Sequence, residues 1–235
     1  METKGLVGNG ELLVERVETP RGISIPNGRE IIAYGFPMEG PGTFKDVMAA
    51  VDKRGTRQTT RQAILLADLL MQNENEPHLA TPLTKFKQNY FWTSTQATSF
   101  VGGVFFYDNV DGTMPSSSDK LTGLCLKKDS RVRFVEPGFR TGAMPISKFL
   151  KHPVVIAHIG EEMIDAAERL VKKCYQKEAY VYAIDRADKD TLTYSALGSR
   201  RDDGGLGLYC YYDLSDNNGY AFPVSLASTE GAKPK

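Results

Sequence analysis

Residues 199–228 read SRRDDGGLGLYCYYDLSDNNGYAFPVSLAS, and the composition of this C-terminal stretch is unusual. It lies in a longer window, from Asp190 to Thr229, that contains no Lys, Glu, Gln, Met or Trp. Asparagine codons, AAC or AAT, give the residues that do occur when either adenine or both are replaced, and they cannot give those five. Strands also disfavour Lys and Glu, and residues 97–113 lack the same five types. Codon diversification and ordinary strand and turn chemistry are therefore both open explanations.

Residues 200–218 differ in composition from a core strand. They mix Arg, Asp, Tyr, Leu and Asn with little hydrophobic alternation, whereas residues 97–113 are rich in Phe and Val. Adaptable binding loops use Tyr, Ser, Gly, Asn and Arg because these supply contact area and hydrogen bonds at low entropic cost. If the strand in this window alternates, Leu206, Leu208 and Cys210 are expected to point inward. The composition thus favours a binding surface on a strand.

Three segments predict amphipathic helices, at residues 43–55, 59–73 and 160–174. The first two begin with the spacing of a capping box, from Thr43 to Asp46 and from Thr59 to Gln62. The apolar residues of TTRQAILLADLLMQN cover nearly the whole circumference, so the second helix should be buried on more than one side. GEEMIDAAERLVKKC carries acidic residues at its start and basic residues at its end, as the helix dipole favours.

Short aromatic and β-branched runs between polar, Gly or Pro turns predict strands elsewhere. They occur in residues 1–35, in residues 89–136 and after the third helix. Trp92, in YFWTST, alternates with polar residues and is expected in the core. The predicted order along the chain is strands, two helices, strands, one helix and more strands. This order predicts an α+β fold rather than alternating βαβ units.

Charge and hydropathy exclude several partners. The chain of 235 residues has 29 basic and 29 acidic residues, a formal net charge of zero, so we expect no nucleic-acid partner. No apolar run is long enough for a membrane span, and METKGLVGNGELLVERV has no run of signal-peptide length. We expect a protein that is either cytoplasmic or displayed on a virion or cell surface. The three cysteines are widely spaced and predict no disulfide framework.

Catalytic and metal-binding motifs are not found. GGLGL at 204–208 lacks the third glycine of a dinucleotide fingerprint, no GxSxG elbow occurs, and DNVD at 108–111 lacks the spacing of a calcium loop. We therefore expect no catalytic residue, no metal and no cofactor. The alternative is a small hydrolase or transferase that uses Asp202 or Asp203 as a base, with Tyr209 as a partner, in the glycine-rich loop.

Two parts of the chain resemble the C-type-lectin-fold variable proteins of diversity-generating retroelements. In this class, which includes phage tropism determinants, adenine-directed mutagenesis rewrites a C-terminal segment. The resemblance rests on the composition of SRRDDGGLGLYCYYDLSDNN, its C-terminal position and the closing GYAFPVSLAS. TRQAILLADLLMQN followed by NYFWTSTQ is similar to the second helix and the WSST-type strand of bacterial lectin-like modules. About half of the chain takes part.

The resemblance implies a C-type lectin-like fold with mixed antiparallel sheets and two to three helices. One domain would span residues 1–235, with a variable region at about 190–220 and a fixed last strand at 219–228. Two subdomains, 1–150 and 151–235, are the alternative. The calcium-site motifs and disulfide pairs of animal lectins are missing, and the paired active-site cysteines of formylglycine-generating enzymes, which share the fold, cannot be located.

The resemblance also implies a function, that of a ligand-binding display protein rather than an enzyme. Its partner would be an unknown protein or cell-surface ligand, and its oligomeric state is left open. Exposed tyrosines would act as aromatic anchors and polar residues as adaptable contacts. The predicted ligand-binding residues are Tyr194, Arg200, Arg201, Asp202, Asp203, Tyr209, Tyr211, Tyr212, Asp213, Ser215, Asp216, Asn217 and Asn218.

Overall fold

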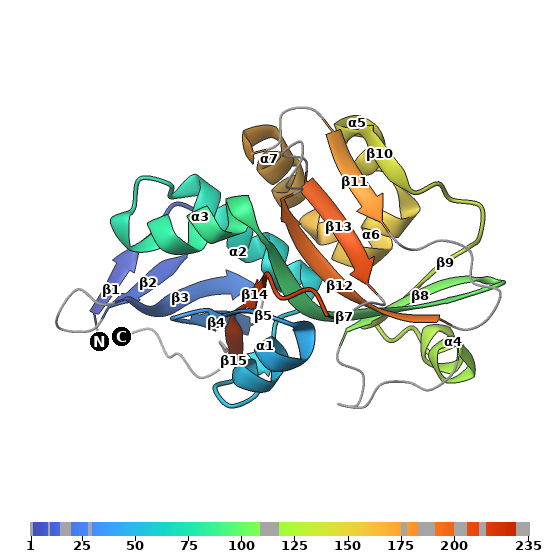
Figure 1. The fold of residues 1–235 in the computed structure, drawn as a ribbon, viewed down its shortest axis with the longest axis horizontal. Helices are drawn as coiled ribbons and strands as arrows, with labels where there is room; N and C mark the ends of the chain where they lie inside the picture. Colours follow the sequence, from blue (N-terminus) through green and yellow to red (C-terminus); the bar gives the residue numbers. More distant parts are fainter. Residues whose placement is uncertain are drawn as a thin grey trace.

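The computed structural model of the chain describes residues 2–8, 10–14, 20–27, 30–108, 118–174, 178–182, 191–199, 206–211 and 215–228. Within these ranges the chain forms two β-sheets, seven α-helices and two short 3₁₀ helices (Figure 1). Helices and strands are mixed as the α+β prediction requires, but the expected two to three helices are too few.

The helices that the sequence did not predict are short. Their sequences contain Pro, Gly or β-branched residues, so local propensity is weak and packing against the sheets stabilises them instead. They are α3 (Ala80–Gln88), α4 (Ser118–Leu126), α5 (Ile146–Phe149) and α6 (Pro153–Ile159).

The three predicted helices are all present, as α1 (Phe44–Val51), α2 (Thr60–Gln72) and α7 (Ile164–Cys174). Thr59 and Gln62 form the predicted capping box, with both reciprocal hydrogen bonds made at the start of α2. The 3₁₀ helices η1 (Pro77–Leu79) and η2 (Glu161–Met163) lead into α3 and α7. No helix in the described part of the chain is long and apolar enough to cross a membrane.

The first sheet has six strands, all antiparallel, in the order β1-β2-β3-β4-β15-β6. Its first four strands follow the chain as a meander, as the hairpin pattern of residues 1–35 predicts. The strands are β1 (Glu2–Gly5), β2 (Glu11–Val14), β3 (Pro20–Asn27), β4 (Glu30–Gly35), β6 (Thr56–Arg57) and β15 (Pro223–Ser228).

The second sheet has nine strands, in the order β10-β11-β13-β12-β7-β14-β5, with β8 beside β7 and β9 beside β8. Two pairs are parallel, β11 with β13 and β14 with β7, so this sheet is mixed. The strands are β5 (Glu39–Gly42), β7 (Tyr90–Phe100), β8 (Gly103–Asp108), β9 (Val132–Val135), β10 (Gly142–Pro145), β11 (Glu178–Tyr182), β12 (Thr191–Ser199), β13 (Leu206–Tyr211) and β14 (Gly219–Ala221).

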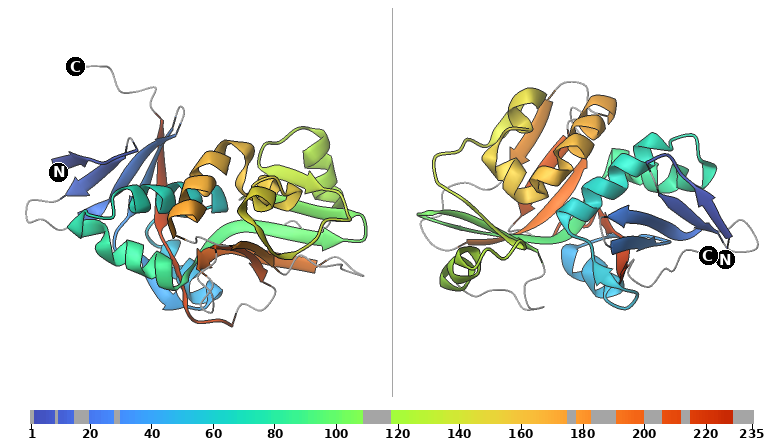
Figure 2. Two further views of the ribbon diagram at one scale, coloured as in Figure 1. Left: turned by 90° about the horizontal axis from the view of Figure 1, so that it is seen from above. Right: turned by 180° about the vertical axis from the view of Figure 1, so that it is seen from behind.

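Helix α2 packs between the two sheets. The largest buried cluster joins residues of the first sheet, such as Ile23 and Val224, to Leu66 of α2 and Leu197 of β12. Seen from behind, α2, α6 and α7 cover one face of the second sheet (Figure 2). The hydroxyl of Tyr34, in β4, donates a hydrogen bond to the Gln62 carbonyl of α2 at 2.8 Å. The single-domain organisation that we expected stays a prediction.

The C-terminal segment links the two sheets. We expected one strand at 219–228, but the structure divides it at Phe222: β14 belongs to the second sheet and β15 to the first. Phe222 is fully buried at this crossing, and its ring packs edge-on against Phe91 of β7, with ring centroids 5.4 Å apart. A single straight strand cannot pair with both sheets, and so the segment is broken there.

Trp92 lies at the centre of a second cluster, beside this crossing. It is fully buried, as predicted, and its indole N–H donates to the Gly42 carbonyl at 3.3 Å. Its ring packs edge-on against Phe44 and Tyr90, with centroid distances of 5.5 and 4.9 Å. A Cβ atom at Gly219 would lie 2.2 Å from the indole nitrogen. Only glycine therefore fits at this position of β14.

The substitution Gly219→Ala tests this packing. We expect it to lower the free energy of unfolding by about 1–3 kcal/mol, because the new methyl group overlaps a buried ring that cannot move away. Gly123→Ala is the control, since a Cβ there meets nothing within 4 Å and Ala is the better helix former. Urea unfolding measures both. Equal stability of the two variants would contradict the role of Gly219.

Candidate functional site

The predicted variable window lies on β12, β13 and the segment before β14. β12 runs between β7 and β13 and is antiparallel to both. Residues directly opposite each other in such a pair lie on the same face of the sheet. Leu197 is opposite Leu208 and Ser195 is opposite Cys210, and all four are buried on the face that the helices cover. The predicted burial of Leu206, Leu208 and Cys210 is confirmed.

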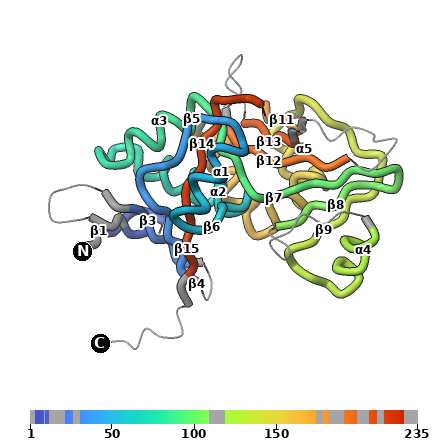
Figure 3. Tube along the Cα trace, turned by 60° about the horizontal axis from the view of Figure 1, so that its bottom comes forward, coloured from blue at the N-terminus to red at the C-terminus, as the bar shows by residue number. Residues whose placement is uncertain are grey.

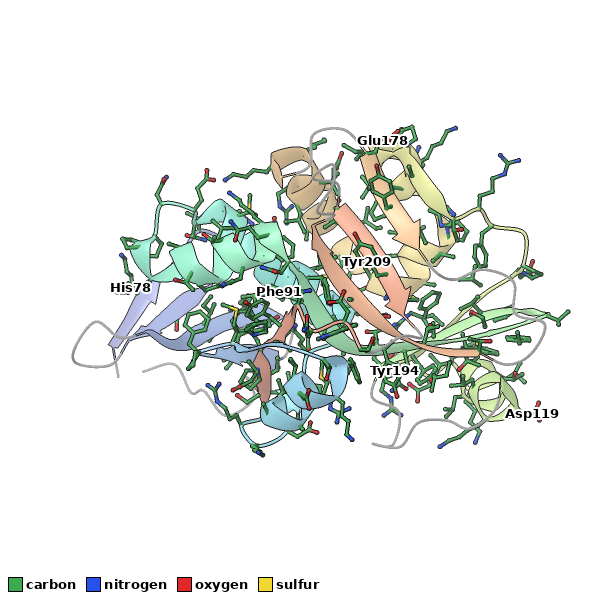
Figure 4. The ribbon with its side chains drawn as sticks, in the orientation of Figure 1. His78, Phe91, Asp119, Glu178, Tyr194 and Tyr209 are labelled. Atoms are coloured by element: carbon green, nitrogen blue, oxygen red, sulfur yellow. The ribbon has the colours of Figure 1, made fainter. Side chains whose placement is uncertain are left out.

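The other face of these two strands carries Tyr194, Ala196, Gly207 and Tyr209. Figure 4 shows Tyr209 on the side of β13 that faces the viewer, with α6 and α7 behind the sheet. We call these four positions the outer face. A Cβ at Gly207 would lie 2.2 Å from the Tyr209 ring, which shows that the ring lies flat over the glycine.

Tyr209 is less accessible than we expected. Only 9% of its surface is exposed, and it belongs to the buried cluster of Trp92 and Ala196. The expectation of an exposed anchor at this position is therefore wrong, because the ring packs along the sheet instead of standing away from it. Its predicted role in ligand binding is not tested by its burial and stays a prediction.

Tyr194 is half-buried at the edge of the outer face nearest α1. Its ring centroid is 4.3 Å from that of Phe44, at an interplanar angle of 48°. Partial burial raises the pKa of Tyr194, and the nearby Arg57 guanidinium opposes that rise. Arg57 is held in place by two hydrogen bonds to the Asp52 carboxylate, at 2.9 and 2.6 Å. A fixed positive charge thus stands beside this tyrosine.

Residues 215–218 form an irregular polar segment before β14, with an Asx turn from Asp216 to Asn218. Ser215 and Asn217 are exposed, and Asp216 and Asn218 are half-buried. The Asp216 carboxylate accepts hydrogen bonds from the Asn218 backbone and side-chain amides, both at 3.1 Å. Asp and Asn stabilise turns in this way. The segment therefore presents hydrogen-bonding side chains from a defined backbone.

The remaining predicted site residues fall outside the described part of the chain. They include the two carboxylates of the alternative enzyme hypothesis. For Tyr211 the structure describes the backbone, which pairs with Tyr194. The residues outside are Arg200, Arg201, Asp202, Asp203, Tyr212 and Asp213.

A buried polar layer lies under β12, on the helix side of the sheet. The Nε2 atom of His158, in α6, is hydrogen-bonded to the Ser195 hydroxyl at 2.7 Å, and the Cys210 sulfur lies 3.9 Å from that hydroxyl. All three side chains are fully buried. Burial lowers the pKa of His158 to about 3 and raises the pKa of Cys210 to about 12. A neutral imidazole and a protonated thiol, closed off from solvent, serve here as structural groups.

The polar layer continues to β8 and β9. Thr95 donates to one oxygen of Asp108 at 2.6 Å, and Arg133 donates to the other at 2.6 Å. Arg133 also donates through Nε to the carbonyl of Ala157 in α6. Buried charges of this kind are tolerated only when paired. The pair therefore fixes α6 against the sheet that carries the window.

Several residues beside the outer face were not predicted from the sequence. Phe44 and Arg57 come from α1 and β6, far from the window in sequence, and Tyr180 of β11 lies opposite Gly207. The compositional signal stops at the window, so it could not identify them. The place of Tyr180 follows from strand order, which puts β11 beside β13. Phe44 and Arg57 lie beside Tyr194 through the packing of α1 and β6, which belongs to the other sheet.

In the part of the chain that the structure describes, no cluster of three or more His, Cys, Asp or Glu residues could hold a metal ion. The chemistry that the described residues offer on the outer face is aromatic contact and hydrogen bonding, with one fixed guanidinium at its edge. These are the means of recognition.

No protein family and no curated protein sequence matches the chain. Its fold matches a solved structure described as "Accommodation of massive sequence variation in Nanoarchaeota by the C-type lectin fold". The TM-score is 0.58 at 16% sequence identity, and the match covers 81% of this chain and 98% of that chain. The chain therefore has a C-type lectin fold, as the resemblance in its sequence predicts. The matched protein is described by its fold and its sequence variation, not by a catalysed reaction.

The buried layer predicts how stability depends on pH. The pKa of His158 is about 3 in the folded chain, and it is about 6.5 in an unfolded one. The unfolded state therefore binds the extra proton, so the contribution is complete above about pH 6.5 and is lost as pH falls toward 3. We expect the free energy of unfolding to fall by about 2 kcal/mol between about pH 7 and pH 5.

The variant His158→Gln should lose most of this slope. A smaller slope of the same sign should remain, because partial burial also lowers the pKa of His152. Urea unfolding followed by the fluorescence of Trp92, the single tryptophan, measures the parent chain and the variant across this pH range. An unchanged slope in the His158 variant would show that another group controls it.

Proposed function

We propose that the chain is a ligand-binding display protein whose segment at about 190–220 is diversified by adenine-directed mutagenesis. The observation that carries this proposal is the division of the window by side-chain burial. Leu206, Leu208 and Cys210 belong to the core, while Ser215 and Asn217 are exposed on a turn. Substitutions at the turn would therefore change the surface and leave the core intact.

The fold supports the same proposal. The matched structure from Nanoarchaeota is described as accommodating massive sequence variation by the C-type lectin fold. In this chain, β12 and β13 are held between β7 and β11, and helices cover their inner face (Figures 1 and 2). A scaffold of this kind would keep its backbone geometry while residues on its outer side change.

The chemistry of the site favours a macromolecular ligand. Tyr194 supplies aromatic area, and Ser215, Asp216, Asn217 and Asn218 supply hydrogen-bonding groups. Tyrosine, serine and asparagine suit broad, adaptable contacts with a protein surface. We infer that the partner is a protein or another cell-surface molecule, and that the predicted residues outside the described ranges extend the same surface.

Comparison of the encoding locus among members of one natural population tests diversification. We expect differences to concentrate in codons 190–220, at positions derived from AAC or AAT, with a near-identical template repeat close by. Codons 59–108, which encode the buried helix α2 and the strands β7 and β8, are the internal control and should stay constant. If codons 190–220 vary as little as the control codons, diversification is ruled out, and strand and turn chemistry explains the composition of the window.

A display library tests tolerance of the fold. One library randomises residues 215–218 with the types reachable from AAC, and a matched library randomises Leu206, Leu208 and Cys210. Most members of the first should resist protease as the parent does, because Ser215 and Asn217 are exposed and Asp216 and Asn218 are only half-buried. Most members of the second should be degraded, because polar groups would enter the core at a cost of about 2–5 kcal/mol each. Similar survival in both libraries would contradict the division of the window.

A further inference from the structure

Strand β9 lies at an edge of the second sheet. Among the strands that the structure describes, it pairs with β8 alone, and it lies outside β8 at the end of the sheet (Figure 3). An edge strand presents backbone N–H and C=O groups that can pair with another strand. β9 is thus a place where the sheet can be extended.

The register identifies which groups point outward. The Asp108 N–H donates to the Arg131 carbonyl at 2.9 Å, so this pair is hydrogen-bonded across β8 and β9. In antiparallel strands, hydrogen-bonded and non-hydrogen-bonded pairs alternate. Phe105 and Phe134 are therefore a non-hydrogen-bonded pair, and the backbone N–H and C=O of Phe134 point away from β8.

A groove of about 480 Å³ lies along this outer edge. One wall is Arg133 to Val135 of β9, and the other is the side of α6 that carries Pro153, Ile156 and Ala157. Pro153 is exposed and Ile156 is half-buried, so the second wall offers apolar surface to solvent. A groove between an edge strand and a helix has the shape that accepts one extended peptide.

Side-chain contacts fix the spacing between the two walls of the groove. Arg133 of β9 donates to the Ala157 carbonyl of α6 and to the Asp108 carboxylate of β8, so its side chain ties β9 to both elements. At the end of the groove near η2, Arg61 pairs with Glu162 at 2.7 Å. A preformed groove binds without first ordering its own residues, which saves part of the entropic cost of association.

Charge indicates the kind of peptide. The groups at the groove are two guanidiniums, of Arg61 and Arg133, and three carboxylates, of Asp108, Glu161 and Glu162. The guanidiniums are each paired with a carboxylate, and Glu161 adds a negative charge at the end near η2. That end favours a basic side chain, while Pro153 and Ile156 favour an apolar one.

We propose that the groove between β9 and α6 binds an extended peptide segment, which adds to the sheet as a strand. Its backbone pairs with Phe134, an apolar side chain contacts Pro153 and Ile156, and a Lys or Arg lies near Glu161. This site is separate from the outer face and does not depend on the proposed function. A second copy of the chain is the less suitable occupant, because α4 and α6 both pack on β9 and a copy would bring its own two helices to the same edge.

Phage-displayed random peptides of about a dozen residues, selected on the immobilised full chain, supply the probe. We expect the selected peptides to share an apolar residue with a nearby Lys or Arg. On binding, a synthetic copy should slow hydrogen exchange at the Phe134 amide. Ile156→Glu should weaken its binding about tenfold or more, because the carboxylate replaces apolar contact. Leu126→Glu, the same charge change at an exposed leucine outside the groove, should change it less than about twofold.

A peptide-side variant keeps the test independent of how the protein variants fold. N-methylation of the peptide amides that pair with β9 should abolish binding. N-methylation of the amides between them should leave binding unchanged. Selection without enrichment, or binding that ignores both Ile156→Glu and N-methylation, would overturn the proposal. A chain that dimerises in sedimentation, and becomes monomeric with Ile156→Glu, would replace the peptide with a second copy.

Discussion

The packing of β7 is the constraint on which the rest of the structure depends. This strand is buried along almost its whole length; β12 pairs along one edge, and β14 and β8 share the other. Trp92 fills the space among β5, β14 and α1, and the absence of a side chain at Gly219 makes that approach possible. Because β14 continues through Phe222 into β15, the same contact sets the position of the first sheet against the second.

The candidate site takes its form from this arrangement. One face of β12 packs against α6, and the other is the outer face, which α1 partly covers, so residues that alternate along the strand lie in different surroundings. Ser195 is tied to His158 and to the core, whereas its neighbour Tyr194 lies at the outer face. Diversification of the whole segment would therefore be limited at every second position of the strand, because those side chains lie in the core. The turn at 215–218 carries no such limit on Ser215 and Asn217, because their side chains are exposed.

Much of the fold was predictable where local chemistry agreed with tertiary packing. The capping box at Thr59 and the apolar circumference of α2 predict a helix that is buried between layers, and the structure has it there. Helix α3, with Pro82 in its sequence, has no comparable local signal. For the site, alternation predicts the burial of Leu208, but it says nothing of Tyr209 lying flat on Gly207, because that contact depends on side-chain packing along the sheet.

The outer face and the groove at β9 are separated by the strand order of one sheet. β12 and β13 lie on one side of β7, and β8 and β9 lie on the other. The buried layer from His158 through Asp108 and Arg133 connects the two regions, since α6 contacts both Ser195 and β9. That layer is fully buried at His158 and paired at Asp108, so it is rigid rather than responsive. A rigid connection would let residues change at the proposed variable surface without moving the groove proposed to bind a peptide.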